Sequence, residues 1–154
     1  RRILIWDEPV DRGRAIRELA GSVAQEKGAG PFERLVDAIM KREEQGSTFF
    51  NEGAAFPHVR IARLPVPVVA LGLARQGVSD VAADREIEVV FLILTPAEAP
   101  ELQTSILGLA SRAGQSRSLV RTLRAARTAE EALDAVTTWE RTDLEPKGEP
   151  PENN

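Results

Sequence analysis

The hydrophobic positions along the chain follow two spacings, one typical of buried strands and one typical of amphipathic helices. Two largely apolar runs that contain β-branched residues, Val66 to Ala74 and Glu86 to Thr95, have the length of strands that are buried on both faces. A third, short strand is predicted at Arg2 to Trp6. Because strands buried on both faces need helices on each side of the sheet, the pattern predicts a layered fold.

Helical spacing accounts for most of the remaining hydrophobic positions. Asp11 is a candidate N-cap, Pro31 sits at a favourable first helical position, and Gly46 is a stop signal. Thr128 and Glu131 form a capping-box pattern ahead of a last helix. Five helices are therefore predicted, after Asp11 to about residue 27, at residues 31–45, 100–113 and 116–126, and from residue 128 onward. The order strand, two helices, strands, three helices predicts an α/β single-domain sandwich, a mixed β-sheet flanked by helices on both faces.

The composition changes after Trp139, where prolines and charged residues leave almost nothing to bury. We therefore expect one domain over residues 1–140 and a disordered tail or linker over residues 141–154. The 154 residues, 42% of them hydrophobic, are enough for one core. The chain begins with Arg1 and not Met, so it is interpreted as a processed product or a piece of a longer polypeptide.

The charge and residue usage exclude several classes of function. A net charge of −4 and a pI near 5.2 give no field that would attract nucleic acid. No apolar run reaches the roughly 20 residues that span a bilayer, which predicts no direct membrane insertion. The absence of cysteine fits a reducing cytoplasm, and one histidine without cysteine offers no zinc ligand set. The sequence also lacks the glycine-rich loops of NTPases and dinucleotide-binding proteins and the nucleophile elbow of hydrolases.

The candidate chemistry centres on the single histidine, His58, which follows Pro57 at the end or edge of a predicted strand. A neutral imidazole is a nucleophile near pH 7, and a phosphoryl group on it requires preorganised hydrogen-bond donors. Arg42, Ser47 and Thr48 supply a guanidinium and two hydroxyls nearby in the sequence. Each also has a structural interpretation. His58 can be a hydrogen-bonded structural residue, and Arg42 can be a solvated charge at a helix end. Ser47 and Thr48 can cap a turn after the helix.

Two other groups of residues have alternative interpretations. Phe49, Phe50 and Phe56 form either an apolar docking rim for a partner or part of the core, with the core as the default. Arginines fall on one face of a predicted helix and beside it, and they form either a patch for an anionic partner or a solvated face. The acidic remainder of the chain favours the solvated face. These arginines are Arg112, Arg117, Arg121, Arg124 and Arg127.

The segment "REEQGSTFFNEGAAFPH", which ends at His58, resembles the active-site segment of the mannitol/fructose-class enzyme IIA domains of the bacterial phosphotransferase system, including nitrogen-regulatory enzyme IIA. Segments 66–78, 89–96 and 128–133 are also similar to that family, and the likeness covers about residues 3–138. Nine positions match the motif: Arg42, Glu43, Gly46, Ser47, Thr48, Gly53, Ala55, Pro57 and His58.

The resemblance implies a phosphoryl carrier, a histidine phosphotransferase component that uses no metal or organic cofactor. His58 would receive the group from an HPr-like phosphocarrier protein, with Arg42 orienting the phosphate and Ser47 and Thr48 as donors. Transport members pass the group to an enzyme IIB domain, and regulatory members act through their phosphorylation state. The alternative is a non-catalytic enzyme IIA-like binding module that contacts a partner such as a membrane transporter.

The sequence departs from the family pattern at three places. Phe49 and Asn51 replace glycines before Gly53, which predicts a different loop shape. Val59 replaces the glycine that usually follows the histidine. A second histidine found in many members is missing, and Glu101 or Gln103 is the nearest candidate for its position.

Overall fold

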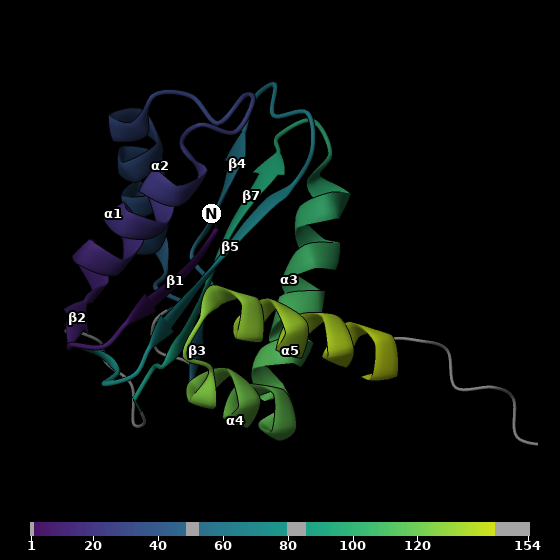
Figure 1. The fold of residues 1–154 in the computed structure, drawn as a ribbon. Coiled ribbons are helices and arrows are strands. Elements are labelled where there is room, and N and C mark those ends of the chain that lie inside the picture. Colours follow the sequence, from purple (N-terminus) through teal and green to yellow (C-terminus); the bar gives the residue numbers. More distant parts are fainter. Residues whose placement is uncertain (1, 49–52, 80–85, 144–154) are drawn as a thin grey trace, which may run out of the picture.

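The computed structural model describes residues 2–48, 53–79 and 86–143, which fold into a sheet covered by helices on both faces (Figure 1). The strands are β1 (Ile3–Trp6), β2 (Val10–Asp11), β3 (Ala54–Ala55), β4 (His58–Ile61), β5 (Val68–Ala74), β6 (Val78–Ser79) and β7 (Val89–Pro96). The helices are α1 (Arg12–Val23), α2 (Phe32–Gln45), α3 (Pro100–Gln115), α4 (Arg117–Ala125) and α5 (Ala129–Asp143).

The main sheet is mixed, as the sequence predicts. Its order is β1-β5-β7, and β3 and β4 both pair with the outer side of β7. β1 runs parallel to β5, β5 runs antiparallel to β7, and β3 and β4 run parallel to β7. β2 and β6 form a separate parallel pair. β4, which begins with His58, therefore lies at an edge of the main sheet.

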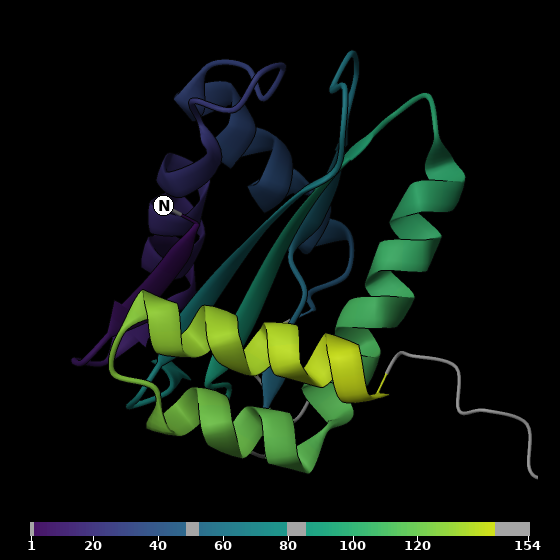
Figure 2. The same cartoon turned by 45° about the vertical axis from the view of Figure 1, so that its right-hand side comes forward.

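Strand β7 divides the core into two layers because its side chains alternate between the two faces of the sheet. Val90, Leu92 and Leu94 belong to the cluster formed with α1 and α2. The intervening side chains belong to the cluster formed with α3, α4 and α5; these are Val89, Phe91 and Ile93. Figure 2 shows the two groups of helices on opposite faces. The prediction of helices on both sides of the sheet is confirmed.

Local signals set most of the helix ends. The side chain of Asp11 accepts a hydrogen bond from the Arg14 N–H at 2.7 Å, as expected of an N-cap. The Gly46 N–H donates to the last turn of α2. Thr128 accepts from the Glu131 N–H at 3.1 Å, the first half of the predicted capping box. Pro31 lies one residue outside α2 and not at its first position.

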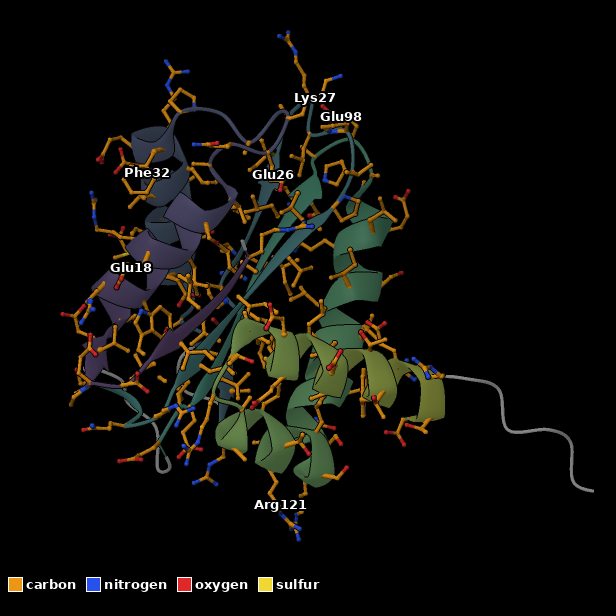
Figure 3. The ribbon with its side chains drawn as sticks, in the orientation of Figure 1. Glu18, Glu26, Lys27, Phe32, Glu98 and Arg121 are labelled. Carbon is orange, nitrogen blue, oxygen red and sulfur yellow. The ribbon has the colours of Figure 1, made fainter. Side chains whose placement is uncertain are left out.

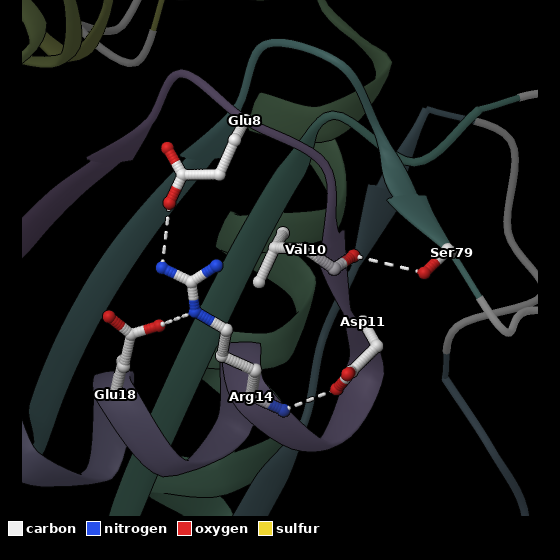
Figure 4. Close-up of polar contacts among 6 residues, drawn as sticks. All are labelled: Glu8, Val10, Asp11, Arg14, Glu18 and Ser79. Carbon is white, nitrogen blue, oxygen red and sulfur yellow. Dashed lines mark hydrogen bonds and ion pairs between the residues drawn. The ribbon is translucent and has the colours of Figure 1, made fainter.

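The start of α1 is also held by ion pairs. The Arg14 guanidinium contacts Glu18 at 2.7 Å and Glu8 at 2.7 Å, so it joins the helix to the loop before it (Figure 4). Hydrogen bonding from Arg14 lowers the pKa of the Glu8 carboxyl. These side chains are exposed, so each pair contributes little to stability.

Several boundaries differ from the predictions. α1 ends at Val23, before its predicted end near residue 27. β5 begins at Val68, two residues after the start of the predicted apolar run, and β7 begins at Val89. α5 continues to Asp143, so the predicted domain boundary at residue 140 falls inside a helix. The rest of the predicted tail lies outside the described residues. Within the described part of the chain, no helix is both long and apolar enough to cross a membrane.

Candidate functional site

His58 is the first residue of the edge strand β4, where it pairs with Ile93 of β7. The carbonyl of Pro57 accepts a hydrogen bond from the Ile93 N–H at 3.0 Å, which anchors the start of the strand. Only 6% of His58 is exposed. The next residue, Val59, packs against the cluster on the opposite face, so strand alternation directs His58 toward α3.

The Nδ1 atom of His58 lies 2.7 Å from the carbonyl oxygen of Phe56. A carbonyl only accepts hydrogen bonds, so the contact requires Nδ1 to carry the proton. In the neutral ring, the lone pair then resides on Nε2. No hydrogen bond to Nε2 occurs among the residues that the structure describes. Nε2 is thus the ring nitrogen whose lone pair can accept a hydrogen bond or form a new bond.

His58 lines a pocket of about 370 Å³ between the sheet edge and α3. The polar groups in it are the imidazole, two hydroxyls and one amide, and no charged side chain lines it within the described ranges. The pocket is lined by Thr48, Ala54, Phe56, His58, Leu107, Ser111, Gly114 and Gln115. Such a lining places neutral hydrogen-bonding groups around the imidazole.

Thr48 is one of the residues predicted to donate a hydrogen bond to the phosphoryl group. Glu43 of α2 holds it in the pocket. The Glu43 carboxylate accepts from the Thr48 N–H at 3.0 Å and from the Thr48 hydroxyl at 2.7 Å. Glu43 is only 4% exposed. The hydroxyl proton of Thr48 is therefore directed to Glu43 in this state. Glu43 belongs to the matched motif, and it continues the buried helical positions Val36 and Ile39, a signal that could have assigned it a role.

Arg42 and Ser47 are not among the described residues that line the pocket. The Arg42 Nη1 atom donates to the Gly46 carbonyl at 3.3 Å, which is the helix-end interaction that the sequence also allows. Ser47 is half-buried and lies directly before Thr48. The role of Arg42 in orienting the phosphoryl group stays a prediction. The role of Ser47 as a hydrogen-bond donor to that group also stays a prediction.

Ser111 and Gln115 of α3 complete the pocket, and sequence reasoning missed both. Gly114 between them lets α3 approach the sheet, because a Cβ atom there would lie 3.0 Å from Phe56 and 3.1 Å from Ala54. The Phe56 ring stacks on Phe91 at a centroid distance of 5.7 Å. Packing against the core agrees with the default interpretation of Phe56. Phe49 and Phe50 lie outside the described residues.

The departures from the family pattern have different structural outcomes. Val59 lies within β4, paired with Leu94, so it does not alter a turn after the histidine. Glu101 is exposed in the first turn of α3, and neither it nor Gln103 is among the described residues that line the pocket. Neither side chain therefore lies beside His58 in this pocket. Asn51 lies outside the described residues.

Comparison with known proteins identifies the family to which the chain belongs. Residues 2–138 match the family described as "Phosphoenolpyruvate-dependent sugar phosphotransferase system, EIIA 2", which covers most of the chain. The chain belongs to this family. It is an enzyme IIA domain of the phosphotransferase system, with a phosphoryl carrier or regulatory role.

Similar proteins include nitrogen regulatory and sugar-specific members. The nitrogen regulatory protein of Escherichia coli K12 is 27% identical over 127 residues, 81% of this chain and 78% of that protein. The crystal structure of nitrogen regulatory protein IIA-Ntr from Neisseria meningitidis matches with a TM-score of 0.77 and 21% identity, over 88% of this chain and 92% of that one.

A second similar structure contains a partner. The complex of enzyme IIAMTL and phosphorylated enzyme IIBMTL from E. coli matches with a TM-score of 0.68 and 19% identity, over 89% of this chain and 94% of that one. At 19% identity, the likeness establishes that the two chains share a fold. It agrees with the mixed sheet flanked by helices described above.

Proposed function

We propose that His58 is the phosphoryl acceptor of this enzyme IIA domain and that an HPr-like phosphocarrier is the donor. The observation that carries the proposal is the 2.7 Å contact between Nδ1 of His58 and the Phe56 carbonyl, which leaves the lone pair on Nε2. The pocket beside the ring has room for a phosphoryl group. Neutral donors from Ser111 and Gln115 lie on its other wall.

In the proposed transfer, the Nε2 lone pair attacks phosphorus and forms the new N–P bond. The bond between phosphorus and the donor atom breaks, and its electron pair leaves with the donor protein. Nδ1 keeps its proton and its hydrogen bond to the Phe56 carbonyl, which stabilises the ring as positive charge develops. The cation that the phosphoryl group requires is assigned to Arg42.

The group then passes to an acceptor of the enzyme IIB type, or the phosphorylated domain acts on a regulatory partner such as a membrane transporter. The E. coli complex with phosphorylated enzyme IIB supports the first of these partners. The alternative is a domain that binds its partner without carrying phosphate. The small exposed fraction of His58, 6%, favours this alternative over a freely reactive histidine.

One experiment separates the two functions. The chain is incubated with HPr, enzyme I and phosphoenolpyruvate and then analysed by intact mass. We expect an acid-labile gain of one phosphoryl group that is lost in His58→Ala. The matched variant Gln103→Ala, on α3 but outside the pocket lining, should keep the gain. No gain in the wild-type chain would support the binding module.

A further inference from the structure

A second pocket, of about 350 Å³, lies where β5 ends and β7 begins, beside α4. It shares no lining residue with the His58 pocket among the described residues. Its lining consists of Leu73, Ala74, Arg75, Glu88, Arg121, Arg124 and Ala125. Glu88 lies five residues before Ile93, the strand partner of His58, which corresponds to about 16 Å along an extended chain.

We propose that this pocket binds a small phosphate-bearing anion, of the class of pyrophosphate or the diphosphate group of a nucleotide. Three guanidinium groups and one carboxylate give its lining a formal net charge of +2 in a chain whose net charge is −4. Guanidinium groups pair with phosphate oxygens through parallel hydrogen bonds. The volume is in the range of small-ligand sites.

Two of the arginines are held in place by protein groups. The Arg75 Nε atom lies 3.1 Å from a carboxylate oxygen of Asp7, and one terminal nitrogen of Arg75 donates to the Ala126 carbonyl. The Nε atom of Arg124 contacts the Glu88 carboxylate. Among the residues that the structure describes, no partner occupies the Nη1 nitrogen of Arg75 or the two terminal nitrogens of Arg124, which can therefore bind a ligand. These contacts preorganise the guanidinium groups.

Glu88, which lines the pocket, holds the Arg124 guanidinium in place. Its side chain is only 14% exposed. Burial raises the pKa of the Glu88 carboxyl, whereas the charge of Arg124 opposes that rise. The carboxylate thus fixes Arg124 at the pocket, and because Arg75 is paired with Asp7, Arg121 contributes the positive charge that no carboxylate of the described residues offsets.

Arg121 is the arginine without a fixed partner. Within the described ranges it makes no ion pair, and Figure 3 shows its side chain projecting from α4 into solvent. Arg121 lines the pocket, and its long side chain can bring the guanidinium over a bound anion. The apolar wall formed by Leu73, Ala74 and Ala125 gives the uncharged part of a ligand a surface to contact.

The chain also contains a matched control. Arg117 lies one turn before Arg121 on α4 but is not among the described residues that line the pocket. Arg121→Gln and Arg117→Gln therefore remove the same charge from the same helix. Because Arg121 makes no ion pair within the described ranges, its replacement leaves no buried carboxylate unpaired.

The test is calorimetric titration of the chain with pyrophosphate and, separately, with ADP, at about 50 mM salt so that surface charge is only partly screened. We expect saturable binding, weakened about tenfold by Arg121→Gln and less than about twofold by Arg117→Gln. Binding should persist in His58→Ala, which separates this proposal from the phosphoryl-carrier function.

Amide chemical shifts locate the ligand. Changes at residues 73–75, 88 and 121–125 support the site, and tighter binding of ADP than of pyrophosphate identifies a nucleotide as the ligand. Equal binding of both identifies the diphosphate group alone. The proposal is overturned by the absence of saturable binding, by equal losses in the two arginine variants, or by shifts confined to the His58 pocket. It is also overturned if a glutamate-rich peptide binds these residues more tightly than either anion.

Discussion

His58 and Phe56 are joined by a hydrogen bond of 2.7 Å between the ring Nδ1 and a backbone carbonyl two residues earlier. The acceptor is part of the backbone, so a side-chain substitution at Phe56 does not remove it. The contact is short and local, and it selects one tautomer of the imidazole. The tautomer of the neutral ring is therefore set by the backbone conformation around Pro57.

This geometry predicts that neutral His58 carries its proton on Nδ1. A long-range ¹H–¹⁵N spectrum of the imidazole at a pH where the ring is neutral should show Nδ1 protonated and Nε2 unprotonated. After phosphoryl transfer, the same spectrum should place phosphorus on Nε2. A proton found on Nε2 in the unmodified chain would contradict the assigned hydrogen bond and the proposed attack together.

The Glu43–Thr48 contact predicts an energetic coupling between the two side chains. Thr48→Val leaves a buried carboxylate oxygen without its hydroxyl donor, and we expect the free energy of unfolding to fall by about 1–3 kcal/mol. Thr48→Ser keeps the hydroxyl and should lose much less. The measurement is urea denaturation followed by circular dichroism.

A double-mutant cycle with Glu43→Gln tests the same contact. The double variant should lose less stability than the sum of the two single losses, by at least about 0.5 kcal/mol. Glu44→Gln is the control. Glu44 is the exposed neighbour of Glu43 on α2, and its substitution removes the same charge. Additive losses in the cycle would show that the two side chains do not interact.

The helix ends and the order of elements could be predicted from the sequence because their signals lie within a few residues. Asp11 caps α1, Gly46 ends α2, and an apolar run eight residues long forms β7. The two-residue strands were not predicted, since they are too short to show a periodicity. Their pairing depends on neighbours that are distant in sequence.

Only the part of the candidate site that comes from the sequence motif around His58 was predicted. His58 and Thr48 lie in one continuous motif, and both line the pocket. Ser111 and Gln115 come from α3, and their proximity to the histidine follows from the crossing of that helix over the sheet edge. The contact of Glu43 with Thr48 was not predicted either, because it depends on the path that the chain takes after the end of α2.

Gly114 and Gly108 provide a matched pair on α3. Gly114→Ala places a methyl group 3.0 Å from Phe56, and we expect a loss of about 1–3 kcal/mol in unfolding free energy because the helix must move from the sheet. Gly108→Ala meets no atom within 4 Å and should stabilise the chain by about 1 kcal/mol. Thermal unfolding of both variants measures the difference. Stabilisation by both would show that the contact of α3 with Phe56 is loose.

The same pair tests the pocket. Displacement of α3 by Gly114→Ala moves Ser111 and Gln115 relative to His58, so phosphoryl transfer should slow. Gly108→Ala leaves this wall in place and should transfer at the wild-type rate. Comparing the initial rates of phosphoryl gain distinguishes the two. Equal rates would indicate that the α3 side chains do not contribute to the transfer.

Thr95 carries a buried hydroxyl that has no hydrogen-bond partner among the described residues. It lies on β7, paired with Arg60, and is 1% exposed. Because an unsatisfied buried hydroxyl costs about 1–3 kcal/mol, Thr95→Val should raise the free energy of unfolding by about 1 kcal/mol or more. Thr95→Ser keeps the hydroxyl and removes a buried methyl group, so it should lower stability by about 1 kcal/mol. Urea denaturation of the three chains provides the comparison, and a loss of stability in Thr95→Val would reveal a bound water or other partner at this hydroxyl.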